Sequence, residues 1–283
     1  MAASPPRPRV FLIANAKKPG AAEAFQRVRA WLEAQGLLAG ADFDGHPELL
    51  NEGRPDYVVV LGGDGTILSV GQAMQQRQVP IIGVNLGKLG YLAEFSISEL
   101  EEHLDRVLAT PALISHRMML DVSIIRPAAS PRDGVALNDC VIRVGPPYRT
   151  VALAVAIDDQ PVTTIVSDGL IIATPSGSTA HNMACGGPII QPDVNAIIMT
   201  PLCPHSLSHC PVVVGPDARV AITLLESSEG AALVLDGRYG GPLEGGTVLS
   251  IRRSAVTFQL VRHPLRRPWD TLTKKLKWGQ NLT

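Results

Sequence analysis

The sequence predicts an α/β domain with a parallel, Rossmann-like sheet in three layers, followed by an all-β sandwich domain. Up to about residue 110, short apolar runs alternate with helix-forming stretches, a pattern typical of parallel strands joined by crossover helices. After Pro111 the chain becomes a succession of short strand patterns separated by Gly, Pro and Asp turns. The length of 283 residues fits two domains of ordinary size.

The first domain is predicted from its elements in chain order. Apolar runs at 9–14, 57–61 and 79–84 indicate strands buried on both faces of a sheet. A helix is expected at 21–35, closed by Gly36, and another at 66–74, with Thr66 as its candidate cap. A further helix is expected at 98–108, because Ser98 and Glu101 have the spacing of a capping box.

The second domain is predicted from strand patterns at 120–124, 151–157, 169–173, 220–225 and 248–251. We place it at residues 113–263, after a first domain of residues 1–112. A last helical pattern at 271–278 lies in a segment, 264–283, that we expect to return to the first domain.

Composition excludes several classes of function. A net charge of −1, a pI near 6.7 and 4% aromatic residues argue against binding to nucleic acid or to an anionic membrane. No apolar run approaches the roughly 18 residues of a membrane helix, and the Pro-rich start lacks the apolar core of a signal peptide. The four cysteines are scattered as in a reducing compartment, so we expect a cytoplasmic protein; they are Cys140, Cys185, Cys203 and Cys210.

One stretch raises the question of a metal site. Cys203, His205, His209 and Cys210 lie close together in the sequence, and Cys and His are zinc ligands. Their spacing matches no standard zinc pattern, so we predict a loop rich in Cys and His and no metal-ligating set.

A glycine turn is the centre of the predicted function. The strand pattern at 57–61 ends at Gly62-Gly63-Asp64-Gly65-Thr66, directly before a helix pattern. Glycines let the backbone approach a phosphate, and the free amides of a helix N-terminus favour negative charge. Asp64 would repel a phosphate unless it binds a cation or accepts a proton from an attacking hydroxyl. The alternative is a tight turn in which Asp64 only caps its helix.

A second polar stretch lies in the predicted β domain, at residues 167–181. The Ser167-Asp168 pair precedes an apolar strand pattern, and four hydroxyl residues between 174 and 179 follow it. Hydroxyls and free amides at a helix start suit the polar groups of a nucleotide. An elaborate helix cap before a core helix is the alternative.

Together these residues resemble the NAD kinase family. Besides the glycine turn, the likeness comprises Asn85-x-Gly87-x-Leu89-Gly90-Tyr91-Leu92, Asn138-Asp139, residues 167–180, Gly186-Gly187-Pro188-Ile189, residues 201–208 and Lys275-Leu276-Lys277-Trp278. These pieces occur in the family's order over nearly the whole chain. The Gly-Gly-Asp-Gly-Thr motif alone is also shared with diacylglycerol and sphingosine kinases and with 6-phosphofructokinases.

The resemblance implies transfer of the γ-phosphoryl group of ATP to the 2′-hydroxyl of the adenosine ribose of NAD. It implies that Mg²⁺ is carried mainly on the ATP phosphates, and that the enzyme is a homo-oligomer, a dimer or a tetramer. Asp64 is then the proton acceptor, and Gly62, Gly63 and Thr66 belong to the ATP phosphate loop. The implied NAD contacts are Asp64, Gly65, Asn138, Asp139, Arg149, Asp168, Thr179, Ala180, His181, Asn182, Met183, Ala184 and Arg238.

Four of these positions depart from the family pattern. Asp139 stands where the family has Glu, His181 where it has Tyr, and Asn182 and Ala184 where it has Ser. The lost hydroxyls leave the preference between NAD and NADH open. None of the departures lies in the glycine turn.

Two alternative functions remain. One is another kinase of the same glycine-motif class acting on a lipid or sugar hydroxyl, and the other is an NAD-binding sensor without turnover. The sequence lacks the second Gly-Thr-x-Asn-Asp type of loop found in the lipid kinases, and the intact Asp64 argues against a sensor.

Overall fold

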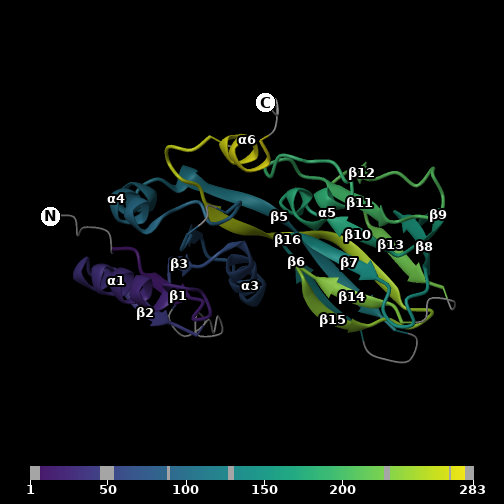
Figure 1. The fold of residues 1–283 in the computed structure, drawn as a ribbon, viewed down its shortest axis with the longest axis horizontal. Helices are drawn as coiled ribbons and strands as arrows, with labels where there is room; N and C mark the ends of the chain where they lie inside the picture. The colour runs from purple at the N-terminus through teal and green to yellow at the C-terminus, as the bar shows by residue number, and fades with distance from the viewer. Residues whose placement is uncertain are drawn as a thin grey trace. The chain divides into compact units, whose positions relative to one another are not determined.

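A computed structural model describes residues 7–44, 54–87, 90–126, 131–225, 230–267 and 269–277. It divides into two compact units, Met1–His116 with Phe258–Thr283 and Arg117–Thr257 (Figure 1). The predicted assignment of ATP to the first domain and NAD to the second stays a prediction. Leu89, Trp278 and most of the polar segment at 47–56 lie outside the described residues.

The first unit is built on a parallel sheet with the strand order β2-β1-β3-β4, beside which Leu260 at the end of β16 pairs in parallel with Ile81. Its elements are β1 (Val10–Ala14), α1 (Ala21–Ala34), β2 (Leu38–Asp42), β3 (Tyr57–Leu61), α3 (Asp64–Met74), β4 (Ile81–Val84), α4 (Ile97–Leu108), η2 (Pro111–Leu113) and α6 (Asp270–Leu276).

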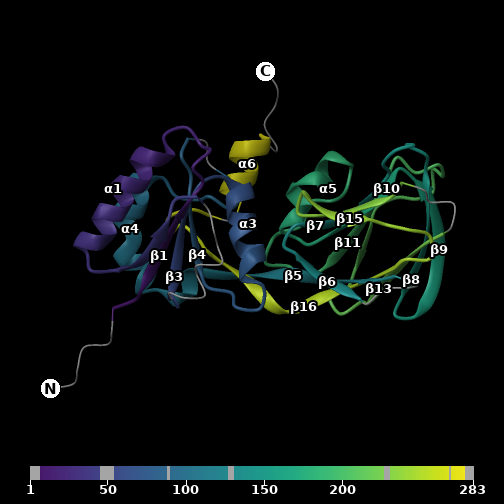
Figure 2. The same ribbon diagram turned by 90° about the horizontal axis from the view of Figure 1, so that it is seen from below.

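Helices cover both faces of this sheet (Figure 2). On one face, Val28 and Leu32 of α1 and Leu104 of α4 join a single apolar cluster with the strands. On the other face lies α3, whose Ile67 fills the space beside Gly83 of β4. Each fully buried side chain of this kind contributes roughly 1.5–3 kcal/mol. The predicted three-layer α/β arrangement is therefore confirmed.

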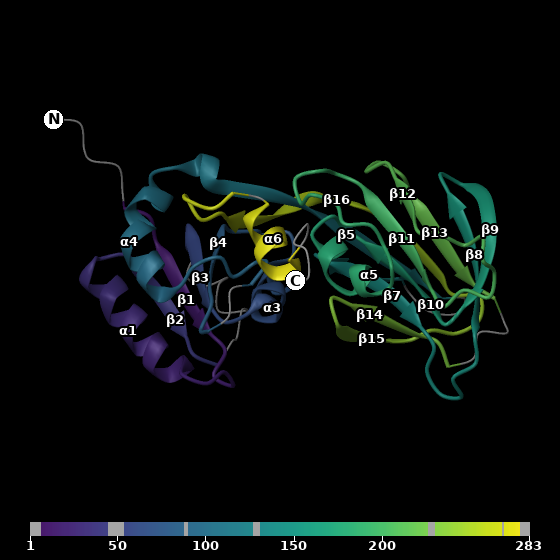
Figure 3. The ribbon, with the colours of Figure 1, turned by 45° about the horizontal axis from the view of Figure 1, so that its top comes forward.

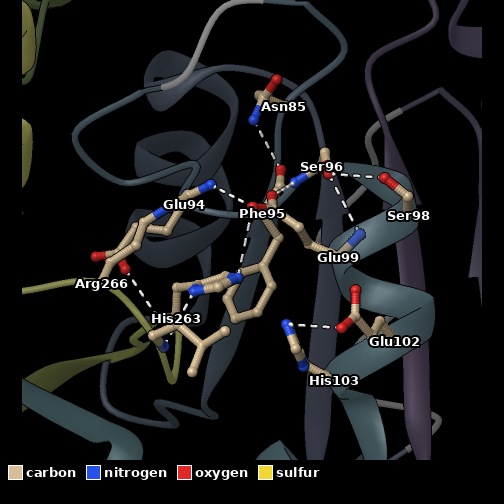
Figure 4. A network of polar contacts seen from close by, with 11 residues as sticks. Asn85, Glu94, Phe95, Ser96, Ser98, Glu99, Glu102, His103, His263 and Arg266 are labelled. Carbon is tan, nitrogen blue, oxygen red and sulfur yellow. Dashed lines mark hydrogen bonds and ion pairs between the residues drawn. The ribbon is translucent and has the colours of Figure 1, made fainter.

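The start of α4 differs from the sequence prediction. Its N-cap is Ser96, whose Oγ accepts a hydrogen bond from the Glu99 amide at 3.2 Å while Glu99 Oε2 accepts one from the Ser96 amide at 2.8 Å (Figure 4). The predicted box of Ser98 and Glu101 is wrong, because Ser98 already lies inside the helix with its side chain exposed. The sequence offers two overlapping Ser-x-x-Glu matches, and the burial of Leu100, Leu104 and Val107 against the sheet selects the first.

One strand of the first unit was not predicted. β2 has the sequence Leu-Ala-Gly-Ala-Asp, which is only half buried and has weak strand preference. It is a strand because it pairs in parallel with β1 at the sheet edge, and a Cβ on Gly40 would press against the ring of Phe11.

The second unit is an antiparallel β-sandwich. One sheet has the order β12-β11-β10-β7-β14-β15 (Figure 3), and the other contains β16-β13-β8-β9, with β5 paired to β16 and β6 paired to β5. Their elements are β5 (Ile114–Ile125), β6 (Arg132–Ala136), β7 (Asp139–Arg143), β8 (Val151–Ile157), β9 (Gln160–Ser167), β10 (Gly169–Ala173), η3 (Gly177–Thr179), α5 (His181–Ala184), β11 (Ile197–Leu202), β12 (Val212–Val214), β13 (Val220–Leu224), β14 (Ala232–Leu235), β15 (Arg238–Pro242) and β16 (Val248–Val261).

Alternating residues of both sheets form the sandwich core. Ile142 of β7 and Ile172 of β10 share one buried cluster with Leu153 of β8 and Ile222 of β13. The intervening residues of the six-stranded sheet, Ile171 among them, form a smaller cluster on its outer face with Cys185 and Ile190. The predicted sandwich is confirmed, and the segment after β10 covers its outer face.

Two end segments complete the fold. β16 is longer than the predicted strand at 248–251 and ends at Val261. Its residues from Phe258 onward belong to the first unit, where Val261 is buried in the core. The last helix, α6, also belongs to the first unit, as expected. Among the described residues, no helix has the length and apolar character needed to cross a membrane.

Candidate functional site

A pocket of about 280 Å³ lies at the carboxyl ends of three parallel strands of the first unit. It is lined by the segments after β1, β3 and β4, namely Lys18, Pro19, Gly62, Gly63, Asn85, Leu86 and Gly87. Because β2 and β3 flank β1 on opposite sides, the chain changes winding direction here, and α/β sheets bind ligands at such a point. Lys18 was not predicted; its place directly after the first strand was the signal that could have identified it.

The glycine turn brings bare backbone to this pocket. A Cβ on Gly62 would lie 2.6 Å from Thr66 Oγ1, whereas a Cβ on Gly63 or Gly65 would meet nothing within 4 Å. Gly62 is therefore required for close packing inside the turn, and the other two glycines leave their backbone open to a ligand.

The helix after the turn begins two residues earlier than predicted. The Gly63 carbonyl accepts the amides of Thr66 at 2.9 Å and Ile67 at 3.2 Å, so α3 starts at Asp64 with Gly63 as its N-cap. Thr66 does not cap the helix, and its Oγ1 accepts a bond from Asn15 Nδ2 at 3.3 Å. The positive end of the α3 dipole thus begins at a residue that lines the pocket.

The Asp64 carboxylate is held by a different loop. Asp64 Oδ2 accepts the Tyr91 amide at 2.9 Å, and Oδ1 accepts the amides of Leu92 at 2.9 Å and Ala93 at 3.1 Å. A Cβ on Gly90 would overlap Asp64 Oδ1, so only glycine leaves room for the carboxylate at that position. Asp64 is therefore oriented by residues 91–93 of the loop after β4, and it does not act as a mere cap of its own helix.

The same loop is braced from two sides. Lys275 Nζ of α6 lies 4.4 Å from the centroid of the Tyr91 ring, an arrangement that attracts the cation to the ring face. Burial, followed by the charge of Asp64, raises the pKa of the Tyr91 hydroxyl. At the start of this loop, Asn85 Nδ2 donates a hydrogen bond to the backbone carbonyl of the buried Phe95 at 2.8 Å (Figure 4). This bond fixes the pocket wall after β4.

In the second unit, the Asn138–Asp139 pair lies at the start of β7 and is held through its backbone. Asp236 accepts the amides of Leu137 at 2.8 Å, Asn138 at 2.7 Å and Asp139 at 3.0 Å. On the carbonyl side, the Thr174 amide donates to the Asn138 oxygen at 2.8 Å. Asp236 was not predicted as a site residue, although an Asp-Gly pair between two strand patterns signals the hairpin turn in which it lies.

The Asp139 side chain is only 5% exposed. Burial, and after it the negative charge of Asp236, raise the pKa of Asp139 to about 7. Asp139, which is one methylene shorter than the Glu of the family pattern, is thus a buried acid with a pKa near neutrality.

Several predicted NAD contacts gather at this end of the sheet. Ala173 pairs with Asp139, so the stretch after β10, which holds Thr179, Ala180, His181, Met183 and Ala184, leaves the sheet beside the Asn138–Asp139 pair. Arg238 begins β15 directly after the Asp236 turn and is exposed.

Asp168 and Arg149 are not brought to this place. Asp168 directly precedes β10, at the end where Gly169 pairs with Arg143. Arg149 lies just before β8, whose first residue, Val151, pairs with Ser167 next to Asp168. The Gly169 end of β10 is four residues along the strand from Ala173, about 14 Å for an extended strand.

Asn182 is buried and fully engaged inside the protein. Its Nδ2 donates to the carbonyls of Ser178 at 3.2 Å and Pro188 at 3.1 Å, and its Oδ1 accepts the Thr200 hydroxyl at 2.6 Å. These bonds tie α5 to β11, so the side chain positions the neighbouring residues.

Two family models match the chain. Residues 46–112 match the ATP-NAD kinase N-terminal domain, and residues 137–263 match the ATP-NAD kinase C-terminal domain. The chain belongs to the NAD kinase family. An NAD kinase from Desulforamulus reducens is 36% identical over 96% of this chain and 98% of the relative, and one from Syntrophotalea carbinolica is 38% identical over 96% and 99%.

Solved structures of NAD kinases share the fold. Yeast NADH kinase, solved in complex with NADH, matches 98% of this chain and 90% of its own with a TM-score of 0.88 and 24% identity. An NAD kinase from Archaeoglobus fulgidus in complex with ATP matches 95% and 98% with a TM-score of 0.76 and 24% identity.

Proposed function

We propose that this chain transfers the γ-phosphoryl group of ATP to the 2′-hydroxyl of the adenosine ribose of NAD, which produces NADP. The observation that supports this function most is the Asp64 carboxylate, which is oriented by three backbone amides beside an open glycine turn. Membership in the NAD kinase family supports both the reaction and the pair of substrates.

The pocket after β1, β3 and β4 suits the phosphates of ATP. The backbone of Gly63, the N-terminus of α3 and the ammonium group of Lys18 all favour negative charge. Mg²⁺ enters with ATP as part of the substrate and offsets the repulsion between the phosphates and Asp64.

Asp64 accepts the proton of the attacking hydroxyl. Oδ1 already accepts two amides and Oδ2 one, so Oδ2 keeps an acceptor position for the 2′-hydroxyl. A carboxylate is too weak a base to ionise a sugar hydroxyl outright. In the loose transition state of phosphoryl transfer the proton leaves late, while the new O–P bond forms and the bond between the γ-phosphorus and the leaving ADP oxygen breaks.

NAD binding is assigned to the second unit. The Asn138–Asp139 pair would hold the adenosine ribose, with Arg238 and residues 179–184 around it. Asn182 would act by positioning its neighbours. Asp168 and Arg149 lie at the far end of β10, so they would contact a different part of the dinucleotide from the ribose.

A coupled assay with ATP, Mg²⁺ and NAD tests this function. We expect the Asp64→Asn variant to bind NAD within a few-fold of the wild type and to lose at least about 100-fold in turnover, because it cannot take up the proton. A melting curve of the variant controls for loss of the three amide bonds. Unchanged turnover would remove Asp64 from the mechanism, and a wild type that phosphorylates only a lipid would point to the other kinase class.

We further propose a homo-oligomer in the cytoplasm. The edge strands β9 and β12 of the sandwich expose apolar side chains, Val162 and Val213 among them, and such edges favour pairing with another chain. The compartment follows from the scattered cysteines of the sequence.

A further inference from the structure

Asp236 forms a tight hairpin turn in the second unit. It joins β14 to β15 as the first residue of a two-residue hairpin loop, and both loop residues have positive φ, 47° at Asp236 and 77° at Gly237. Asp followed by Gly is a preferred pair for such a turn, because Asp tolerates this backbone region and Gly adopts it freely.

The side chain of this turn contacts the backbone of residues 137–139. One carboxylate collects three successive amides at 2.7–3.0 Å, and the Asp236 amide donates in return to the Asp139 carbonyl at 3.0 Å. Hydrogen bonds to an ionised acceptor are stronger than neutral ones. These four bonds hold the hairpin turn of Asp236 against the backbone of residues 137–139, although the two segments are about one hundred residues apart in the chain.

The segment after β10 also contacts residues 137–139. Thr174 Oγ1 donates to the Leu137 carbonyl at 2.6 Å, and a Cβ on Gly177 would overlap the Asn138 carbonyl. The backbone of residues 137–139 is thus used on both sides. Within the described part of the chain, the Asn138 side-chain amide has no hydrogen-bond partner, so it is available to a ligand.

We propose that Asp236 positions the Asn138–Asp139 pair for dinucleotide binding by gathering the amides of residues 137–139 on its carboxylate. Asp236 does not touch the reacting atoms in this arrangement. It sets the direction of the two side chains by fixing the backbone that carries them. This inference rests on the proposed function, because that function assigns Asn138 and Asp139 to the ribose.

Steady-state kinetics with NAD and with ATP varied separately test this role. In Asp236→Ala all three acceptor bonds are lost, and we expect the KM for NAD to rise at least about 10-fold while the KM for ATP stays within about two-fold. Asp236→Asn keeps one oxygen that can accept the amides of Asn138 and Asp139. Its KM for NAD should therefore lie between that of the wild type and that of Asp236→Ala. A carboxylate with only a structural role would lower the melting temperature without this selective and graded effect.

Two further variants separate the possible failures. Asp217→Ala is the matched control, because Asp217 is an exposed acid of the same unit with an ion pair to Arg253 at 2.7 Å, and it should leave both KM values unchanged. Asn138→Ala tests the ribose assignment itself. A raised KM for NAD in Asn138→Ala with an unchanged one in both Asp236 variants would overturn the role of Asp236 alone. An unchanged KM in Asn138→Ala would overturn the assignment and the inference together.

Discussion

Two carboxylates of this chain, Asp64 and Asp236, are each held by three successive backbone amides. Such a set of donors fixes both the position and the direction of an acid, because the amides belong to rigid backbone. The two acids differ in their place. Asp64 lies within the open glycine turn of the first unit, whereas Asp236 lies in a hairpin turn and bonds to the backbone of the Asn138–Asp139 pair.

Gly90→Ala tests the orientation of Asp64. The added Cβ would overlap Asp64 Oδ1 and displace the carboxylate from its amides. We expect a loss of about 100-fold or more in turnover, with the KM for NAD changed by less than a few-fold, as measured in the coupled assay. Gly215→Ala is the control, because Gly215 lies outside the pocket and a Cβ there meets nothing within 4 Å. Equal activity of the two variants would show that the position of the carboxylate does not matter.

Asp139 makes stability depend on pH. Burial and the charge of Asp236 raise its pKa from 3.8 to about 7 in the folded protein. At a pH between these two pKa values, the folded state keeps a proton that the unfolded state has released. The free energy of unfolding therefore falls as the pH rises. The loss approaches about 1.4 kcal/mol per pH unit inside the window and ends above pH 7.

The measurement is urea unfolding of the wild type and Asp139→Asn at pH 5, 6, 7 and 8. The wild type should lose a few kcal/mol relative to the variant between pH 5 and 7 and little more beyond. Stability curves that stay parallel across this range would contradict the raised pKa.

At the scale of elements, helix α4 depends on which serine caps it. Ser96 makes both bonds of the capping box, whereas Ser98 is exposed within the first turn. Ser96→Ala should therefore lower the free energy of unfolding by about 1 kcal/mol. Ser98→Ala should change it by less than about half of that, and chemical denaturation can measure both. A larger effect at Ser98 would restore the box that the sequence suggested.

At the scale of the whole molecule, the exposed sandwich edges predict self-association. Val162 of β9 is 57% exposed, and an edge strand with apolar side chains invites a second chain. We expect the wild type to elute as a dimer or tetramer in size-exclusion chromatography with light scattering, and Val162→Lys to reduce the mass. Val194→Lys, at an exposed apolar residue outside both edge strands, is the control. A monomeric wild type would refute the proposal.

The amino-acid sequence alone was enough to predict the buried strands, the glycine turn after β3 and the order of the family motifs. These features are local, because periodicity, glycine spacing and motif order can be read within a short window. It also identified Asp64 as the candidate catalytic residue. The sequence misassigned two details: α3 begins at Asp64 with Gly63 as its N-cap, and α4 is capped by Ser96 and not by Ser98.

The surroundings of the candidate site depend on contacts between residues far apart in the sequence. Asp64 meets its amides 27–29 residues farther along the chain, and Asp236 meets its own 97–99 residues earlier. No local pattern encodes such partners, since the strand order of each sheet brings them together. The antiparallel register of β7 and β10 likewise places Asp168 away from the Asn138–Asp139 pair, and the fold buries the side chain of Asn182 against Thr200.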